Sequence, residues 1–300
     1  MFSDESDYHA TALHLCALQS SFEEVILVPV DVASVKSVAV AHGPRVLTFP
    51  VPSLDAVAQL DDKWAFFNLC TALGIKTPRT KVFDDKYDLS RNWPGEELKY
   101  PFVIKPTDKE GSAGFRVITS REHYQETVLG QNYAFKPLVA QSFVPGHDID
   151  ISVFGIDGRI LHHAVQTYID GRLWFVHNSE FVHRAATIAE ALRLSGIVHI
   201  DARVDSRTGE LNLIEANPRV WGSMNALTLM GLNFIRAGLE WILTGTTSAA
   251  RTVTDESVSL AQVALKAMRG GTLSDDQRLF LRHTLFDPPL LLSRLIRRRV

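Results

Sequence analysis

The pattern of apolar and polar positions predicts short strands paired as hairpins and separated by helices. Residues 25–30 and 45–50 are apolar runs typical of buried strands. Residues 148–156 alternate polar and apolar, turn at Asp157-Gly158 and return over 159–166, as in a β-hairpin. Further strands are predicted at 102–105, 115–118 and 138–141, and helices at 8–19, 62–73 and 181–194. Hairpins between helices favour α+β lobes over one doubly wound sheet.

A second hairpin is predicted where two apolar runs flank Arg207-Thr208-Gly209, because its glycine suits the left-handed end of a three-residue loop. With this loop closed, Asp201 lies opposite Glu215. Glu215 and Asn217 share a face because they are two apart on one strand. Two carboxylates and an amide oxygen suit Mg²⁺ rather than zinc. An ion held this way keeps positions open for phosphate oxygens, so a nucleotide site is the first hypothesis.

The alternative for this hairpin is that its polar residues simply line an exposed sheet. Leu211 and Leu213 begin the strand face that we expect to carry Glu215 and Asn217, which would direct the polar pair toward a covered cleft. Two carboxylates there would repel each other unless a cation or an arginine joined them. Arg219 follows closely, and the pattern favours the metal interpretation.

A strand that ends at Lys105 leads into a loop of small residues, 106–115. Small residues allow backbone N–H groups to approach phosphate oxygens. No Gly-Lys-Ser/Thr closes the loop onto a helix, so it is not the Walker pattern. The alternative is an ordinary hairpin with a long glycine-containing loop.

The segment from Gln141 to Asp148 is a strand that breaks at Pro145-Gly146. Its exposed backbone N–H and C=O groups could pair with an adenine edge, and Asp148 could accept from ribose hydroxyls. The alternative is a linker between lobes with a surface aspartate.

Composition limits the class of protein. A chain of 300 residues with 46% hydrophobic and 22% charged residues is expected to form two or three soluble lobes. The formal net charge of -3 gives no basis for general nucleic-acid binding. The two cysteines, Cys16 and Cys70, are isolated, and the chain begins with an acidic segment rather than a signal peptide, so we expect a cytoplasmic protein. It has no long apolar run, so we expect no membrane span. The basic tail at 290–299 is expected to pack as a helix, with peripheral contact to an anionic membrane as the alternative.

Taken in order, these motifs resemble the ATP-grasp superfamily, and most closely carboxylate–amine ligases of the carbamoyl-phosphate-synthase and D-alanine–D-alanine-ligase kind. The resemblance covers roughly residues 55 to 245. It runs through Asp62-Lys63, Val103-Ile104-Lys105-Pro106, the glycine-containing loop, Gln141 to Asp148, and Glu215-Ala216-Asn217-Pro218-Arg219 with Gly222-Ser223.

The resemblance implies an α+β ATP-grasp fold in which two lobes clasp a nucleotide, preceded by a short, incomplete α/β domain. We expect the short domain at 1–60, the N-lobe with the glycine-containing loop at 61–137, the C-lobe with the metal hairpin at 138–245, and a C-terminal helical segment at 246–300.

Individual roles follow from the same resemblance. Lys63 and Lys105 would neutralise the phosphates, and the amides of Gly111, Ser112, Ala113 and Gly114 would fold over them. Gln141, Ser142, Phe143 and Val144 would form the adenine hinge, with Asp148 on the ribose. Asp201, Glu215 and Asn217 would hold Mg²⁺, with Mn²⁺ as a substitute. Arg219 would grip the transferred phosphoryl group, and Arg203 is a second candidate for substrate or phosphate contact.

The implied activity is ATP- and Mg²⁺-dependent ligation. A small-molecule carboxylate attacks the γ-phosphate, and an amine captures the resulting acyl phosphate to form an amide. Alternatives are an ATP-binding module with regulatory or lost catalysis, an ATP-grasp acid–thiol ligase or phosphotransferase, and a membrane-associated interaction protein. Residues 227–230 and the C-terminal helices could supply a homodimer interface.

Overall fold

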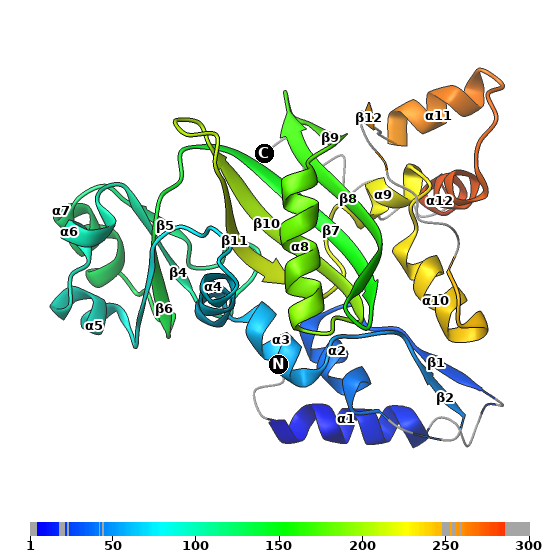
Figure 1. Cartoon of the computed structure of the whole chain (residues 1–300), viewed down its shortest axis with the longest axis horizontal. Helices are drawn as coiled ribbons and strands as arrows, with labels where there is room; N and C mark the ends of the chain where they lie inside the picture. The colour runs from blue at the N-terminus through cyan, green and yellow to red at the C-terminus, as the bar shows by residue number, and fades with distance from the viewer. Residues whose placement is uncertain are drawn as a thin grey trace.

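The computed structural model describes residues 5–17, 22, 24–41, 43, 45–247, 253, 256–257 and 260–285. Within this part of the chain the strands form a two-stranded, a six-stranded and a four-stranded sheet (Figure 1). Among the described helices, none combines the length and apolar character needed to cross a bilayer. The basic tail predicted at 290–299 lies outside the described residues.

The strands are ordered β1-β2 in the parallel pair, β11-β10-β7-β8-β9-β12 in the six-stranded sheet and β3-β6-β4-β5 in the four-stranded sheet. Their bounds are β1 Val25–Leu27, β2 Val46–Thr48, β3 Thr80–Phe83, β4 Phe102–Pro106, β5 Arg116–Ile118, β6 Leu138–Ser142, β7 Gly146–Ile156, β8 Arg159–Ile169, β9 Arg172–Val176, β10 Gly196–Asp205, β11 Leu211–Asn217 and β12 Glu256–Ser257.

The helices alternate with these strands. Their bounds are α1 Glu5–Ala17, α2 Val32–Ala39, α3 Leu54–Asp61, α4 Lys63–Ala72, α5 Lys86–Arg91, α6 Gly95–Leu98, α7 Arg121–Tyr124, the π-helical turn η2 Gln125–Leu129, α8 Ser179–Ala191, α9 Met224–Leu229, α10 Phe234–Thr244, α11 Leu260–Met268 and α12 Asp275–Leu285.

The six-stranded sheet is antiparallel along β11-β10-β7-β8-β9-β12. The predicted turn between β7 and β8 is confirmed: Asp157 and Gly158 have φ of 46° and 84°, and a two-residue hairpin with positive φ at both central positions suits the right-handed twist of its strands. Helix α8 crosses one face of the sheet (Figure 1). It buries Phe181, Ala185 and Ile188 in the core beneath it, at the spacing of a single helical face.

Helix α4 packs into the same core, because Phe66 and Cys70, four residues apart, are fully buried there. Asp62 caps the helix by accepting a hydrogen bond of 2.8 Å from the backbone N–H of Ala65. Gly74 follows the helix with φ of 67°. The first residue of the helix, Lys63, is thereby fixed to the six-stranded sheet.

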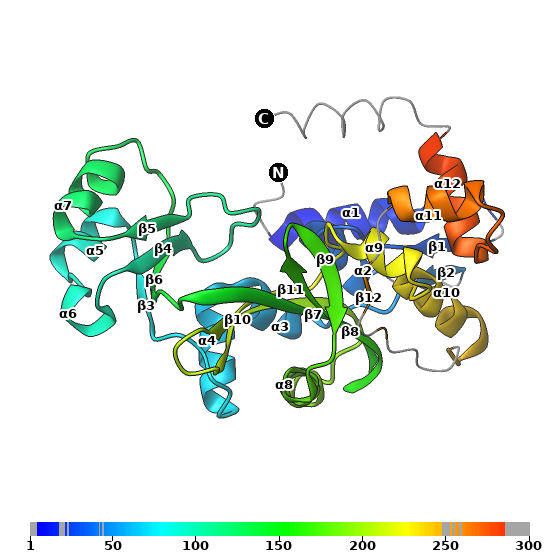
Figure 2. The same cartoon turned by 90° about the horizontal axis from the view of Figure 1, so that it is seen from above.

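The four-stranded sheet and α5–α7 form a second lobe beside the six-stranded sheet (Figures 1 and 2). Phe102, Ile104, Leu138 and Ala140 are fully buried in the core of this lobe. All five residues of β4 are buried, including Lys105 near its end.

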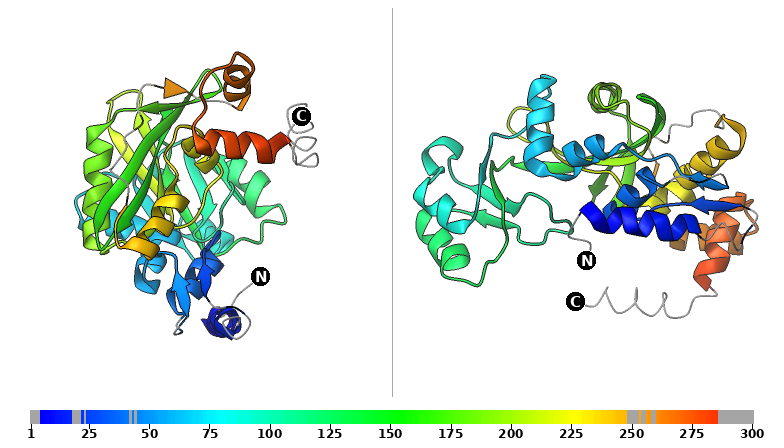
Figure 3. Two further views of the ribbon diagram at one scale, coloured as in Figure 1. Left: turned by 90° about the vertical axis from the view of Figure 1, so that its right-hand side faces the viewer. Right: turned by 90° about the horizontal axis from the view of Figure 1, so that it is seen from below.

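The first described residues form a small unit in which β1 and β2 are parallel neighbours and α2, which the sequence pattern had not indicated, runs between them in the chain. Helices α1 and α2 pack together beside these strands (Figure 3). Helices α10–α12 lie at the opposite end of the molecule from the four-stranded lobe (Figure 3).

Candidate functional site

A cleft of about 440 Å³ lies between the four-stranded and six-stranded sheets. The predicted residues that line it are Lys63, Lys105, Ser112, Ala113, Gln141, Ser142, Phe143, Val144, Asp148, Asp201, Arg203 and Glu215. Gly111, Gly114, Asn217 and Arg219 are not among the lining residues. The sequence had not singled out Asp150, Lys109 or Tyr168, which also line the cleft.

Two buried lysines meet one carboxylate in this cleft. Glu215 Oε2 lies 3.0 Å from Lys105 Nζ and 3.8 Å from Lys63 Nζ. Burial lowers the pKa of the Lys105 ammonium, and the charge of Glu215 opposes this effect. With both lysines charged, one carboxylate balances only one of the two ammonium groups. The two ammonium groups are donors of the kind that bind phosphate oxygens.

The glycine-containing loop is tied down from both sides. Lys63 Nζ donates to the carbonyl of Lys109 at 2.7 Å, and Tyr133 donates from its hydroxyl to the carbonyl of Gly114 at 2.6 Å. Gly114 has φ of 73°, and a Cβ atom there would come within 2.8 Å of Phe135 and Pro106. Both the backbone conformation and the packing therefore call for glycine at this position.

The chain passes from one lobe to the other along Gln141–Gly146, and Arg203 holds this crossing. Arg203 donates from Nε to the carbonyl of Val144 at 2.8 Å and from Nη2 to the carbonyl of Gly146 at 2.6 Å. Its Nη1 lies 2.5 Å from Asp148 Oδ1. The guanidinium also lies 5.6 Å from the centroid of the Phe143 ring. Arg203 is thus engaged with the predicted adenine and ribose positions.

Gln141 differs from its neighbours because its side chain points into the four-stranded lobe. The side chain is buried, and its Nε2 donates to Thr80 Oγ1 at 2.9 Å. The side-chain nitrogen of Gln141 is therefore engaged within the lobe, and its backbone is paired with Thr80 of β3 and Val103 of β4.

The hairpin of β10 and β11 pairs Asp201 with Glu215, as predicted. Strand β10 ends at Asp205 and β11 begins at Leu211, so the loop between them is longer than the predicted three residues. The pairing of Ala202 with Leu213 leaves Ile214 as an extra residue in β11, which is a β-bulge.

The bulge shows that the predicted common face was wrong. Leu211 and Leu213 enter the core of the six-stranded sheet, whereas Ile214 and Glu215 line the cleft. An inserted residue shifts the alternation of side chains by one position. Glu215 reaches the cleft because of this shift.

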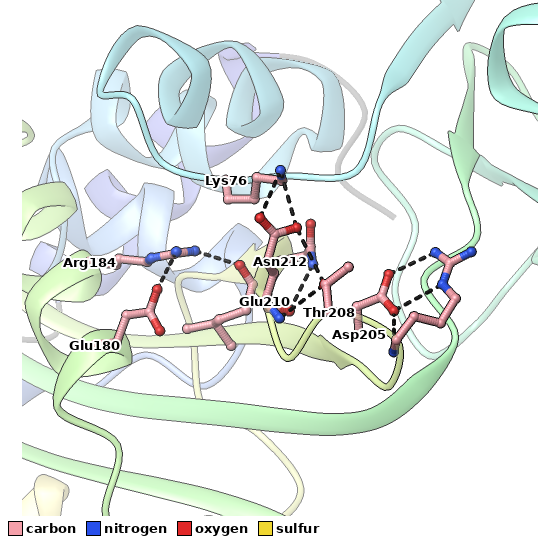
Figure 4. Close-up of polar contacts among 9 residues, drawn as sticks. Lys76, Glu180, Arg184, Asp205, Thr208, Glu210 and Asn212 are labelled. Carbon is pink, nitrogen blue, oxygen red and sulfur yellow. Dashed lines mark hydrogen bonds and ion pairs between the residues drawn. The ribbon is translucent and has the colours of Figure 1, made fainter.

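Polar contacts clamp the loop of this hairpin to the surrounding elements (Figure 4). Lys76 Nζ lies 3.3 Å from a carboxylate oxygen of Glu210, and Arg184 donates to the carbonyl of Leu211 at 2.6 Å. Arg184 is also paired with Glu180 on α8 at 2.5 Å. These contacts fix the hairpin against α8 and the segment before β3 (Figure 4).

Strand register places polar side chains in two rows across the sheet. The first row is Gln166, Asp150, Asp201 and Glu215, on β8, β7, β10 and β11 in that order. The second row is Ser152, His199 and Asn217, on β7, β10 and β11. Asp150 and His199 were not predicted as site residues. Each lies two positions from a predicted one, Asp148 or Asp201, so the same alternation could have found them.

Asp201 is held at both carboxylate oxygens. Its Oδ1 lies 3.1 Å from His199 Nε2, and its Oδ2 accepts from Asn217 Nδ2 at 2.8 Å. His199 is stacked on Trp221, with ring centroids 5.0 Å apart and an interplanar angle of 10°. Burial, followed by the charge of Asp201, raises the pKa of Asp150 to about 7.

Arg219 lies where β11 ends and contacts the opposite lobe. It donates to Asn217 Oδ1 at 3.2 Å and to the carbonyl of Val220 at 2.8 Å. It also forms an ion pair with Glu110 of the glycine-containing loop. The loop and the end of the metal hairpin are therefore joined directly.

The predicted magnesium ligands are compatible with this arrangement. Asp201 and Glu215 are paired carboxylates on adjacent strands, and oxygen donors of this kind suit Mg²⁺. Asn217 directs its amide at Asp201. Its oxygen accepts from Arg219, so the amide would have to turn away from both partners to offer that oxygen to an ion beside Asp201.

Comparison with known proteins gives a consistent family. Residues 134–265 match the family described as "ATP-grasp in the biosynthetic pathway with Ter operon". A D-alanine–D-alanine ligase of Anaplasma marginale (strain Florida) is 25% identical over 198 residues, covering 60% of this chain and 58% of the ligase. The arginine-specific large chain of carbamoyl phosphate synthase from Bacillus subtilis (strain 168) is 21% identical over 183 residues, covering 56% of this chain and 17% of that protein. The chain thus matches only part of the length of either relative.

Solved structures show the same fold. An N5-carboxyaminoimidazole ribonucleotide synthetase in complex with ADP has a TM-score of 0.57 at 15% identity, with 78% of this chain and 64% of that chain covered. An L-amino acid ligase from Bacillus licheniformis has a TM-score of 0.52 at 20% identity, with 71% of this chain and 59% of that chain covered. The two lobes of mixed helices and antiparallel strands and this set of relatives give the chain an ATP-grasp fold, and its sequence resembles the carboxylate–amine ligases of that superfamily.

Proposed function

We propose that this chain binds MgATP in the cleft and ligates a small carboxylate to an amine. The observation that carries the proposal is the meeting of Lys63 and Lys105, both buried, at Glu215 between the two sheets. Two buried ammonium groups at one carboxylate are costly without an anionic ligand, and a triphosphate supplies the missing negative charge.

The nucleotide would lie along the cleft. Its base would contact the chain at Ser142–Val144, and its ribose would contact Asp148. The phosphates would lie between the two lysines and the backbone of residues 111–114. This order is supported because most of these residues line one cleft. Gly111 and Gly114 do not line it, but they belong to the same loop as Ser112 and Ala113, which do.

The proposed chemistry has two steps. A carboxylate oxygen of the substrate forms a bond to the γ-phosphorus, and the bond from that phosphorus to ADP breaks. The amine nitrogen then forms a bond to the acyl carbon, inorganic phosphate leaves, and the nitrogen loses a proton. Lys63, Lys105 and Arg219 would stabilise the charge that develops on the transferred phosphoryl oxygens. Mg²⁺ held by Asp201, Glu215 and Asn217 would add charge neutralisation on the phosphates.

The carboxylate substrate would approach from the side of the small N-terminal unit. Hydrogen bonds from Ser34 lower the pKa of Asp31 at the start of α2, and the nearby charge of Arg219 lowers it further. The charge of Arg219 thus acts on this unit while its side chain donates to Asn217 of the β10–β11 hairpin, as a group gripping an acyl phosphate between the two would need.

The test is a screen for ADP release over pairs of amino acids and small acids, followed by mass spectrometry of the product. An amide product supports the proposal. A thioester or a phosphorylated acid would identify another ATP-grasp reaction. Binding of MgATP, seen as a raised melting temperature, without ADP release under any pairing would identify a regulatory module instead.

Variants of the hairpin make the test specific. Asp201→Ala and Glu215→Ala should keep the far-ultraviolet circular dichroism of the wild type and lose ADP release. Glu210→Gln is the matched control, because Glu210 is an exposed carboxylate of the same hairpin that pairs with Lys76. Normal turnover in Asp201→Ala or Glu215→Ala would refute the assignment.

A further inference from the structure

The two cross-strand rows bring one imidazole and two carboxylates together. One ligand atom each from Asp150, His199 and Asp201 can be chosen so that all three lie within 4.8 Å of one another. In the part of the chain that the structure describes, these three side chains have the spacing needed to bind one metal ion. Glu215 is not part of it, since Glu215 is turned toward the two lysines.

His199 is oriented as metal-binding histidines usually are. Its ring is buried, its Nδ1 lies 3.0 Å from Ser152 Oγ, and its Nε2 points to Asp201 at 3.1 Å. A histidine ligand commonly donates from one ring nitrogen to a neighbouring oxygen while the other nitrogen binds the ion. Ser152 is fully buried, so it holds the ring in one orientation.

An unsatisfied acceptor lies beside the cluster in the first row. Gln166 is directly paired with Asp150 across β7 and β8. It is 1% exposed, and its Oε1 has no hydrogen-bond partner, while its Nε2 donates to Ser223 Oγ at 2.7 Å. A buried oxygen without a hydrogen-bond partner is costly unless a cation or a donor reaches it, and Gln166 stands directly across the ladder from Asp150.

We propose that Asp150, His199 and Asp201 bind a divalent transition-metal ion in the absence of nucleotide. One nitrogen and two carboxylate ligands suit Mn²⁺ or Zn²⁺ better than Mg²⁺, which prefers oxygen alone. Asp201 has an oxygen on each side, with Oδ1 toward His199 and Oδ2 toward Asn217. It therefore belongs both to this site and to the proposed nucleotide-linked magnesium site, and the new site does not depend on ATP binding.

The experiment titrates the nucleotide-free full chain with Mn²⁺ and follows free Mn²⁺ by electron paramagnetic resonance. We expect about one ion bound per chain, little competition from Mg²⁺, and displacement by Zn²⁺, which binds nitrogen–oxygen sites more tightly than Mn²⁺. Quenching of Trp221 fluorescence gives a second signal because this ring stacks on His199, and Trp221→Phe should remove the signal but not the binding.

His199→Gln and Asp150→Asn should each weaken Mn²⁺ binding by about tenfold or more. Two variants serve as controls: Glu210→Gln removes an exposed carboxylate of the β10–β11 hairpin outside the cluster, and His163→Gln removes a histidine on β8 that is also outside it. Both should bind Mn²⁺ like the wild type. Circular dichroism checks the fold of each variant, and Asp150→Asn keeps the test valid if His199→Gln does not fold.

Several results would overturn the proposal. These are the absence of Mn²⁺ binding without nucleotide, wild-type affinity in both His199→Gln and Asp150→Asn, or an equal loss in Glu210→Gln. ADP release with Mg²⁺ is measured separately, so a failed metal site and a failed ligase assignment give different results.

Discussion

Lys105 and Glu215, which lie 110 positions apart in the chain, form an ion pair of 3.0 Å across the cleft. Lys105 belongs to the four-stranded sheet and Glu215 to the six-stranded sheet. The contact therefore depends on the relative position of the two lobes, and it occurs where the proposed phosphates would enter.

Lys105→Met should weaken ATP binding about tenfold to a hundredfold, because a hydrogen bond to a charged group contributes about 1.5–3 kcal/mol. Isothermal titration calorimetry with MgATP measures the effect. Lys76→Met is the control, since Lys76 also pairs with a glutamate, Glu210, but is half exposed and lies outside the cleft. Equal losses in the two variants would contradict a phosphate-binding role for Lys105.

Arg219→Gln should lower ADP release by about 100-fold or more, as expected when a group that stabilises transition-state charge is removed. Glu110→Gln breaks the same ion pair from the other side. Glu110 is 62% exposed, and exposed pairs contribute about 0–1 kcal/mol, so this variant should remain active. A comparable loss in Glu110→Gln would mean that the ion pair, rather than Arg219 itself, supports turnover.

The stability of the metal-free protein should depend on pH through Asp150. Its pKa is raised from 3.8 to about 7, so the folded state binds this proton more tightly than the unfolded state. The resulting stability is fully present below pH about 4 and is lost as the pH rises toward 7. Wild type should therefore lose stability relative to Asp150→Asn between pH 5 and pH 8, in thermal melts with a chelator. Parallel pH profiles for the two proteins would show that the carboxyl is not perturbed.

Two glycines of the loop should differ when they are replaced by alanine. Both have positive φ, but a Cβ on Gly111 meets nothing within 4 Å, whereas one on Gly114 meets Phe135 and Pro106 at 2.8 Å. Gly111→Ala should cost about 1 kcal/mol of unfolding free energy and Gly114→Ala about 2–4 kcal/mol. Urea unfolding measures both. Equal costs would show that backbone conformation alone sets the requirement.

Local patterns in the sequence were enough for some parts of the site. The turn glycine and the flanking apolar runs predicted that Asp201 lies opposite Glu215, and this pair is present. The register next to the loop is one residue away from the predicted one, with Val204 opposite Leu211, and the bulge at Ile214 restores the predicted pair. The cap of α4 by Asp62 is likewise a local feature. These features depend on a few neighbouring residues and not on the rest of the fold.

Other parts depend on contacts between distant segments. The row that joins Asp150 to Asp201 requires β7 to pair with β10, and no local signal encodes that pairing. The bulge at Ile214 was missed because one inserted residue leaves the apolar composition of the strand unchanged. The burial of Lys63 was missed because it depends on the packing of α4 and on the position of the glycine-containing loop.

The packing of α4 has a consequence for motion. Helix α4 fixes Lys63 to the six-stranded sheet, which also carries Glu215, whereas Lys105 belongs to the four-stranded lobe. If the two lobes move apart, Glu215 stays close to Lys63, whereas Lys105 moves away with the four-stranded lobe. Glu215 then always keeps one positively charged neighbour. Its charge therefore remains compensated in the open conformation, before the triphosphate binds.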